Sequence, residues 1–167
     1  MKRRKSFIGL FSLCLLLQAC SSPKEYENHL SLKGEKWKVD NVLPFDFDVS
    51  DTAQAYAFGM DIRYTDAFPT QDLFLFLKTI FPDGSTSQDT LHCYLFEADG
   101  KPLGKGHRIK ELTIDYSLIR FPMPGHYTMH FVQGMRMDEV EGIASFGISL
   151  QKFENVKPQR HGKQKAQ

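Results

Sequence analysis

The sequence predicts an all-β protein whose body is a single antiparallel β-sandwich, either immunoglobulin-like or jelly-roll-like. Apolar and polar residues alternate with a period of two along most of the body, which is the pattern of strands with one buried face. Fourteen phenylalanines and six tyrosines add to this preference, because aromatic side chains pack well on a pleated surface. Clusters of glycine, proline and aspartate separate the alternating segments, and no segment after residue 19 sustains the stripe of an amphipathic helix.

The first 19 residues have the features of an export signal. Four basic residues precede an apolar run over residues 7–17, which is too short for a membrane-spanning helix of roughly 20 residues. Ala19 stands directly before Cys20, and the stretch LQAC resembles the bacterial lipobox, in which the cysteine thiol carries a diacylglycerol. We therefore expect residues 1–19 to be a cleaved lipoprotein signal peptide and Cys20 to be lipidated. A plain secretory leader with an incidental cysteine is the alternative.

Changes in composition divide the rest of the chain. Residues 20–36 are polar with few apolar side chains, which predicts a short tether between the lipidated N-terminus and the body. Residues 37–153 form the predicted sandwich domain, because about 115 residues are enough for one core and too few for two typical domains. The basic and polar residues 154–167 are typical of a disordered tail.

The first predicted strands of the body are of two kinds, with either one apolar face or two. In residues 43–49 and 55–65, large apolar side chains alternate with charged or small residues, which predicts one buried face. Residues 73–81, with the sequence LFLFLKTIF, are apolar on both faces and predict a central strand covered on each side. The turn signal FPDGSTS follows, so this strand and residues 88–98 are expected to form a hairpin with a long loop.

The C-terminal half continues in the same way. Residues 126–133 and 144–151 place aromatic and aliphatic side chains at alternate positions, which predicts two more strands. The stretch ADGKPLGKG reads as a glycine-rich turn between strands, and MDEVEGI has room for one helical turn. Together the segments predict about six to eight strands in one antiparallel domain.

Charge and cysteine content restrict the class of protein. Cleavage before Cys20 would remove four of the 21 basic residues and leave 17 against 20 acidic residues. Such a mildly acidic body lacks the basic stripe that nucleic-acid binding requires, so no nucleic-acid partner is expected. With Cys20 lipidated, Cys93 is the single remaining thiol, and no intramolecular disulfide can form. The core alone must therefore hold the fold.

Sequence motifs for catalysis are incomplete. Ser149 lies in the stretch GISLQ, which lacks the second glycine of a nucleophile elbow. His92 and Cys93 are neighbours on a predicted strand and point to opposite faces, so they cannot form a dyad. Asp46 and Asp48 alternate with phenylalanine, which is typical of a solvated strand face rather than of a glycosidase carboxylate pair. We therefore expect no enzymatic activity.

Motifs for metal or phosphate binding are also incomplete. His126 and His130 share one face of a predicted strand but lie roughly 13 Å apart. Two ligands that are each about 2 Å from one zinc ion cannot be so far from each other. The stretch ADGKPLGKG resembles a phosphate-binding loop only in composition. We expect no cofactor, and any metal site would have to be assembled from distant strands.

Three stretches of the body resemble a known family. They are AFPTQDLFLFLKTIFPDGSTSQDTL, ADGKPLGKG and FPMPGHYTMHFVQGMRMDEVEGIASFGISLQ. Together with the lipobox and Trp37, they resemble the GldH family of gliding-motility lipoproteins of Bacteroidetes. The resemblance extends from Trp37 to Gln151. Its most specific residues are Gln133-Gly134-Met135-Arg136, Asp138, Gly142-Ile143 and Gly147.

This resemblance implies a lipoprotein that gliding relatives need for cell-surface movement and for the associated secretion of adhesins. It implies partners among other gliding-motility lipoproteins and envelope proteins. The lipid anchor itself is expected from the lipobox, with the outer membrane favoured and its periplasmic face and the cell surface both left open. It implies no catalytic residues, and it does not imply that this organism glides. Arg136 and Asp138 are candidates for a structural ion pair, which we favour, or for a partner contact.

Two functions remain open at this point. The first is a non-catalytic interaction module that docks other envelope proteins. The second is a carbohydrate-binding lipoprotein, in which aromatic side chains near loops form a stacking platform; the candidates are Tyr64, Phe68, Tyr116 and Phe121. A flat exposed row of aromatic rings would favour a glycan, whereas an apolar patch with a polar rim would favour a protein partner. The sequence identifies no small-molecule ligand.

Overall fold

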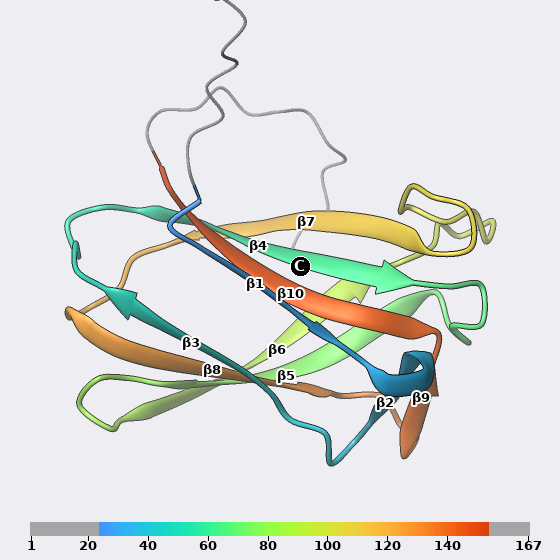
Figure 1. Cartoon of the computed structure of the whole chain (residues 1–167), viewed down its shortest axis with the longest axis horizontal. Coiled ribbons are helices and arrows are strands. Elements are labelled where there is room, and N and C mark those ends of the chain that lie inside the picture. The colour runs from blue at the N-terminus through green and yellow to red at the C-terminus, as the bar shows by residue number, and fades with distance from the viewer. Residues whose placement is uncertain (1–23, 154–167) are drawn as a thin grey trace, which may run out of the picture.

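The computed structural model describes residues 24–153, which form two antiparallel four-stranded sheets packed face to face (Figure 1). The first sheet contains, in spatial order, β1 (Tyr26–Ser31), β10 (Ile143–Lys152), β4 (Tyr56–Tyr64) and β7 (Lys110–Ile119). The second sheet contains β3 (Leu43–Val49), β8 (Gly125–Gln133), β5 (Asp72–Ile80) and β6 (Thr86–Tyr94). One end carries the short helix η1 (Lys33–Glu35) and the pair β2 (Lys36–Lys38) and β9 (Glu139–Glu141). The predicted all-β sandwich is confirmed.

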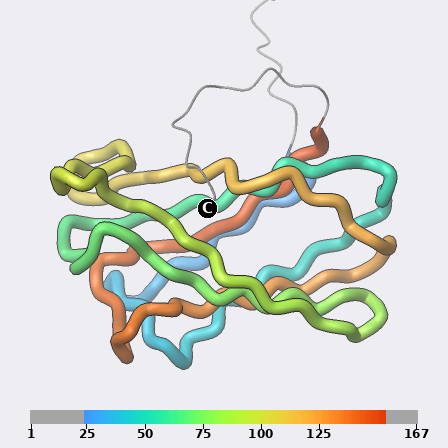
Figure 2. The backbone as a smooth tube through the Cα atoms, turned by 180° about the vertical axis from the view of Figure 1, so that it is seen from behind, coloured from blue at the N-terminus to red at the C-terminus, as the bar shows by residue number. Residues whose placement is uncertain are grey.

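The eight long strands are paired in the order of a jelly roll. β1 pairs with β10, β3 with β8, β4 with β7 and β5 with β6, so each pair encloses the next one along the chain. The backbone therefore runs like one long hairpin that is wrapped around the core, with the β5–β6 turn at its tip (Figure 2). Of the two predicted architectures, the jelly-roll-like one is correct and the immunoglobulin-like one is not.

The six predicted strands correspond to β3, β4, β5, β6, β8 and β10. The predicted hairpin is also confirmed, because Ile80 pairs with Thr86, but residues 81–85 connect the strands by a short turn and not by the long loop that was predicted. Gly84 adopts φ 82° in this turn, a backbone conformation that costs glycine less than any residue with a Cβ.

The structure differs from the sequence prediction at both edges of the first sheet. β1 lies inside the predicted tether 20–36, so that prediction is wrong over Tyr26–Ser31. Only two side chains of β1, Tyr26 and Leu30, pack against the core, because an edge strand buries little of its surface. β7 was not predicted either: the register shifts between Phe58 and Gly59 of its partner strand, and this irregularity interrupts the alternation near Tyr116.

The segment MDEVEGI contains strand β9 and not the helical turn that was predicted. Val140 in β9 lies opposite Trp37 in β2, and both side chains are fully buried. Gly142 follows with φ 82°, and a Cβ at this position would collide with the backbone of Phe68. Burial of Val140 against the core thus overrides the weak helical pattern of the segment.

Aromatic side chains fill the space between the two sheets. The ring centroid of Phe146 lies 4.8 Å from that of Phe131, 5.5 Å from Trp37 and 5.9 Å from Phe45. All four side chains are fully buried, and they come from β10, β8, β2 and β3. This cluster therefore joins both sheets and the β2–β9 pair, and each ring pair adds about 0.5–1.5 kcal/mol beyond the burial of its surface.

Buried tyrosines hold the connecting loops. The Tyr64 hydroxyl donates to the carbonyl of Leu95 at 2.6 Å and accepts from the N–H of Gly104 at 2.8 Å. Burial raises the pKa of the Tyr64 phenol, which keeps this donor protonated. The stretch ADGKPLGKG forms the turn that was predicted, with the N–H of Glu97 donating to the carbonyl of Lys101 at 2.8 Å.

The aromatic cluster generates a stability prediction. Phe146→Ala should lower the free energy of unfolding by about 3–5 kcal/mol, because it removes a ring that contacts three others and leaves a cavity. Urea unfolding can be followed by the fluorescence of Trp37, the single tryptophan. Leu118→Ala is the control, since Leu118 is 55% exposed and its loss should change stability by no more than about 0.5 kcal/mol. Equal effects of the two substitutions would contradict the proposed role of the cluster.

Candidate functional site

The structure keeps the candidate catalytic side chains apart. Cys93 is fully buried, whereas His92 faces the opposite side of the sheet, as the strand pattern predicts. Burial raises the pKa of the Cys93 thiol to about 12, so the reactive thiolate does not form near neutral pH. Ser149 lies on the outer face of the first sheet, where neighbouring side chains leave it only 8% exposed.

The four aromatic residues predicted as a glycan platform do not form one. Tyr64, Phe68 and Phe121 are buried in the core, and Tyr116 alone is exposed. The loops fold inward at these positions because each ring finds aromatic partners; Phe121, for example, packs edge-on against Tyr56 at 5.4 Å. This prediction is therefore wrong.

Exposed aromatic side chains gather instead on the outer face of the second sheet. Alternation along β5 and β6 turns Phe74, Phe76, His92 and Tyr94 toward this face, and we call these four residues the aromatic patch. Phe76 is 53% exposed, Tyr94 38% and Phe74 36%. The prediction that residues 73–81 are covered on both faces is wrong, because a sandwich of two layers leaves the outer face of each strand in solvent.

Contacts between neighbours hold the patch in one arrangement. Phe74 and His92 are paired across β5 and β6, and their rings stack with centroids 4.3 Å apart at 7°. The Tyr94 ring lies 4.3 Å from His92 at a tilt of 49°. His92 Nε2 also lies 2.6 Å from Oδ2 of Asp72, which fixes the orientation of the imidazole. Such cross-strand contacts between side chains stabilise a sheet and restrict rotamers.

Gln133, the last residue of β8, organises the loop beside the patch. Its side chain is fully buried, its Nε2 donates to the carbonyl of Met137 at 2.8 Å, and its Oε1 accepts from the N–H of Met135 at 2.8 Å. Both polar ends of the amide are therefore satisfied, as burial requires. The first residue of the family-specific stretch thus has a structural role.

The next residues of this stretch contact the aromatic patch directly. The N–H of Gly134 donates to the carbonyl of Phe74 at 2.7 Å, and the N–H of Phe74 donates to Sδ of Met135 at 3.3 Å. A Cβ at Gly134 would lie 3.2 Å from the Phe76 ring, so glycine leaves room for this ring to lie close to the backbone. Gly134 and Met135 therefore support two aromatic residues of the patch.

A shallow hollow of about 580 Å³ adjoins the patch at Phe76. Its apolar side includes Val42, which is 43% exposed, and Val132. Its polar residues are Lys78, Gln88, Asp89, Thr90 and His130. A surface that combines apolar and polar side chains in this way is usual for a protein–protein interface.

Arg136 and Asp138 lie in the loop between β8 and β9 and are both exposed. In the part of the chain that the structure describes, neither side chain forms an ion pair, so the predicted structural ion pair is absent. Asp138 uses its backbone carbonyl to accept a hydrogen bond from the N–H of Val39 at 2.8 Å. Both charged groups are left in solvent, close in sequence to the residues that support the patch.

The predicted lipid anchor, Cys20, lies outside the described residues. Across residues 24–153, no helix has the length and apolar character needed to cross a membrane.

The fold and the patch define a class of protein: a single jelly-roll sandwich that presents a rigid aromatic surface on one outer sheet face. Comparison with known families makes the assignment specific. The chain belongs to the GldH lipoprotein family, whose model matches residues 24–150. The family resemblance inferred from the sequence is thus confirmed, and the chain is a lipoprotein of the gliding-motility type.

Two relatives match over most of their length. The gliding motility lipoprotein GldH homolog of Christiangramia forsetii is 28% identical over 158 residues, which cover 89% of this chain and 96% of that protein. The gliding motility lipoprotein GldH of Flavobacterium johnsoniae is 28% identical over 151 residues, which cover 85% of this chain and 93% of that protein.

Likeness to solved structures is low. Dimeric latent PorU from Porphyromonas gingivalis gives a TM-score of 0.35 at 10% identity, over 79% of this chain and 13% of that chain. This likeness carries no inference about function.

The burial of Cys93 predicts that its thiol is unreactive in the folded protein. An aromatic disulfide reagent at neutral pH should modify no thiol at this position in the native lipoprotein and one equivalent after unfolding in urea. A Cys93→Ser variant identifies the signal that belongs to this residue. Rapid modification of Cys93 in the native state would show that β6 opens or that the thiol is accessible.

Proposed function

We propose that this protein is a non-catalytic component of the gliding-motility and adhesin-secretion machinery, which docks another envelope protein through the aromatic patch. Membership in the GldH lipoprotein family supports the general setting. The names of the two relatives, both gliding motility lipoproteins, support a role in gliding motility. The docking role rests on the geometry of the outer face.

The observation that carries this proposal is the position of Phe76. Its ring is 53% exposed, although it belongs to β5, which is hydrogen-bonded to a neighbour on each side. Exposed apolar groups on a rigid strand cost solubility without contributing to the core, so contiguous patches of this kind mark interaction sites. Aromatic side chains held in one conformation lose little entropy on binding and often dominate the energy of an interface.

A protein partner accounts for the patch better than a glycan. Sugars stack on the open face of an aromatic ring, but Phe74 and His92 are stacked on each other at 4.3 Å. One side of the Phe76 ring lies close to the backbone at Gly134 and is not open to a sugar. The hollow beside Phe76 is also lined by polar groups, which would pair with the backbone or side chains of a protein.

The anchor on Cys20 completes the proposal. Acyl chains contribute about 0.8 kcal/mol for each buried methylene, so a multiply acylated cysteine holds the protein firmly on a membrane. We place the anchor in the outer membrane. Arg136 and Asp138, exposed in the loop after β8, are proposed as charged contacts at the edge of the docking surface.

The docking proposal predicts that Phe76→Asp abolishes recovery of partners in a crosslinking pull-down from native membranes. A charge at Phe76, between the rest of the patch and the hollow, should weaken the complex about thirtyfold or more, since aromatic contacts buried in an interface are worth about 2 kcal/mol or more. Leu118→Asp is the matched control, because Leu118 is 55% exposed on the other sheet.

If Arg136 contacts the partner, Arg136→Ala should lower the recovery of partners in the pull-down more strongly than it lowers the stability of the fold, measured as the melting temperature.

The outcomes of this experiment are distinct. Loss of partners with Phe76→Asp alone supports docking through the patch. Equal loss with Leu118→Asp, or full recovery with both variants, would contradict it. If the wild-type protein binds to a glycan array and Phe76→Asp abolishes this binding, the ligand of the patch is a carbohydrate and not a protein.

The anchor generates a separate prediction. Cys20→Ala should yield a protein that is soluble or retains its leader, because no lipid can be attached without the thiol. Membrane fractionation with immunodetection measures the change. Unchanged membrane retention of a correctly processed Cys20→Ala protein would show that the anchor lies elsewhere.

A further inference from the structure

We propose that Glu27, His29 and Asp61 form a binding site for a divalent metal ion of the zinc class on the outer face of the first sheet. The site would connect β1 with β4 across the intervening strand β10. It is on the opposite sheet from the aromatic patch, and it does not depend on the docking role.

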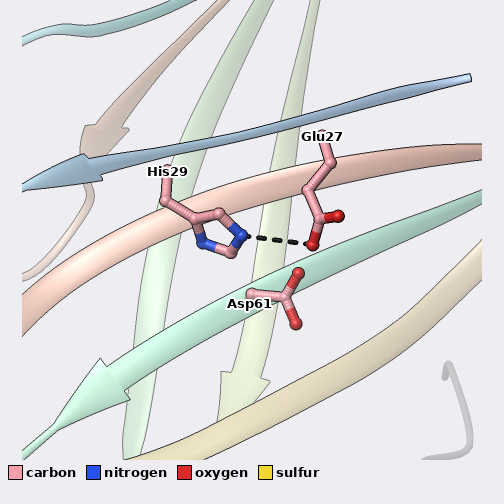
Figure 3. A group of neighbouring side chains, drawn as sticks. All are labelled: Glu27, His29 and Asp61. Carbon is pink, nitrogen blue, oxygen red and sulfur yellow. Dashed lines mark hydrogen bonds and ion pairs between the residues drawn. The ribbon is translucent and has the colours of Figure 1, made fainter. Parts of the chain in front are cut away.

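The register of the first sheet brings these side chains together. His29 pairs with Gly147 of β10, and Gly147 pairs with Asp61 of β4, so the three residues form one row across the sheet. A Cβ at Gly147 would collide with the imidazole of His29, and this glycine therefore lets the ring lie over β10. Figure 3 shows Glu27 and His29 reaching from β1 toward Asp61 on the far side of β10.

The donor atoms are suited to a transition metal. One imidazole nitrogen and two carboxylate oxygens lie within 4.8 Å of one another. Zinc binds such nitrogen and oxygen ligands at about 2.0–2.2 Å, so ligands on opposite sides of the ion are at most about 4.4 Å apart. Small rotations of the exposed Glu27 and His29 side chains would bring the ligand atoms from up to 4.8 Å to the separation of about 4.4 Å or less that zinc requires. A site with an imidazole favours zinc-class ions over calcium or magnesium, which prefer oxygen ligands alone.

Asp61 provides a second, independent indication of a ligand. Its Oδ1 accepts a hydrogen bond from Thr113 Oγ1 at 2.5 Å, which fixes the carboxylate. Its Oδ2 is buried and has no hydrogen-bond partner among the described residues. A buried carboxylate oxygen without a donor is costly, and an ordered water or an ion is one way in which native proteins satisfy such an atom.

The charges around the cluster are compatible with a cation. Lys24 Nζ contacts Oε1 of Glu27 at 2.6 Å, so the carboxylate of Glu27 already binds a cationic group. Lys24 is 39% exposed, so it can move into solvent when a metal ion replaces it. His29 is 34% exposed, which leaves space for water molecules to complete the coordination of the metal.

The structural effect of the metal follows from the position of β1. This strand is an edge strand that is hydrogen-bonded only to β10. A metal held by Glu27, His29 and Asp61 would add a direct connection from β1 to β4. The six residues of β1 would then be fastened to the sheet by side chains as well as by backbone hydrogen bonds.

The test uses the full-length lipoprotein, purified in detergent and freed of metal with a chelator. Isothermal titration with zinc chloride should show one saturable site for each chain, and zinc should raise the melting temperature. His29→Ala and Asp61→Asn should each weaken zinc binding by about tenfold or more, since each removes one of three protein ligands. Magnesium chloride should bind more weakly than zinc.

The second sheet offers a matched control of the same residue types. His126 lies 3.1 Å from Asp48 and 3.6 Å from Asp46, but the two carboxylates contact different nitrogens of the ring and do not converge. Asp48→Asn should therefore leave zinc binding unchanged. Absence of saturable zinc binding, or equal binding by the wild-type and His29→Ala proteins, would overturn the proposal. Circular dichroism of the metal-free variants distinguishes loss of a ligand from loss of the fold.

Discussion

The contacts of Phe146 with Phe131, Phe45 and Trp37 are the interaction on which the rest of the structure depends. These rings join the two sheets and the β2–β9 pair at one point in the core. Cys93 is a free thiol in the described part of the chain, so no disulfide there can substitute for the packing. The nested pairing of the strands makes the dependence stronger, because β1 and β10 lie far apart in the sequence and their pairing costs loop-closure entropy that packing of the core must offset.

Most of the fold could be predicted from the sequence, because strands with one buried face carry a clear period of two. Phe45 and Phe47 in β3 and Tyr127 and Phe131 in β8 show this directly. The edge strands could not be predicted in the same way: β1 presents only Tyr26 and Leu30 to the core. The pairing of strands, and hence the jelly-roll order, depends on contacts between residues far apart in sequence, which a local period does not contain.

The candidate sites were less predictable, for physical reasons that differ between them. LFLFLKTIF contained the signal for the aromatic patch, since a two-layer sandwich cannot cover both faces of a strand. Tyr64 and Phe121 could not be placed from their positions near loops, because loop side chains turn inward when a core accepts them. His29 and Asp61 lie close together because the register of three strands places Gly147 between them. A sequence alone does not contain this register.

A chain that is held at its N-terminus transmits mechanical load into the body through β1. Tyr26 lies opposite Leu150, so the chain enters the first sheet at the end where β10 finishes. A pull perpendicular to β1 would open its hydrogen bonds to β10 one after another from Tyr26, whereas a pull along the strand would shear all of them at once. The direction of the pull therefore determines whether the first strand peels away under tension or withstands it.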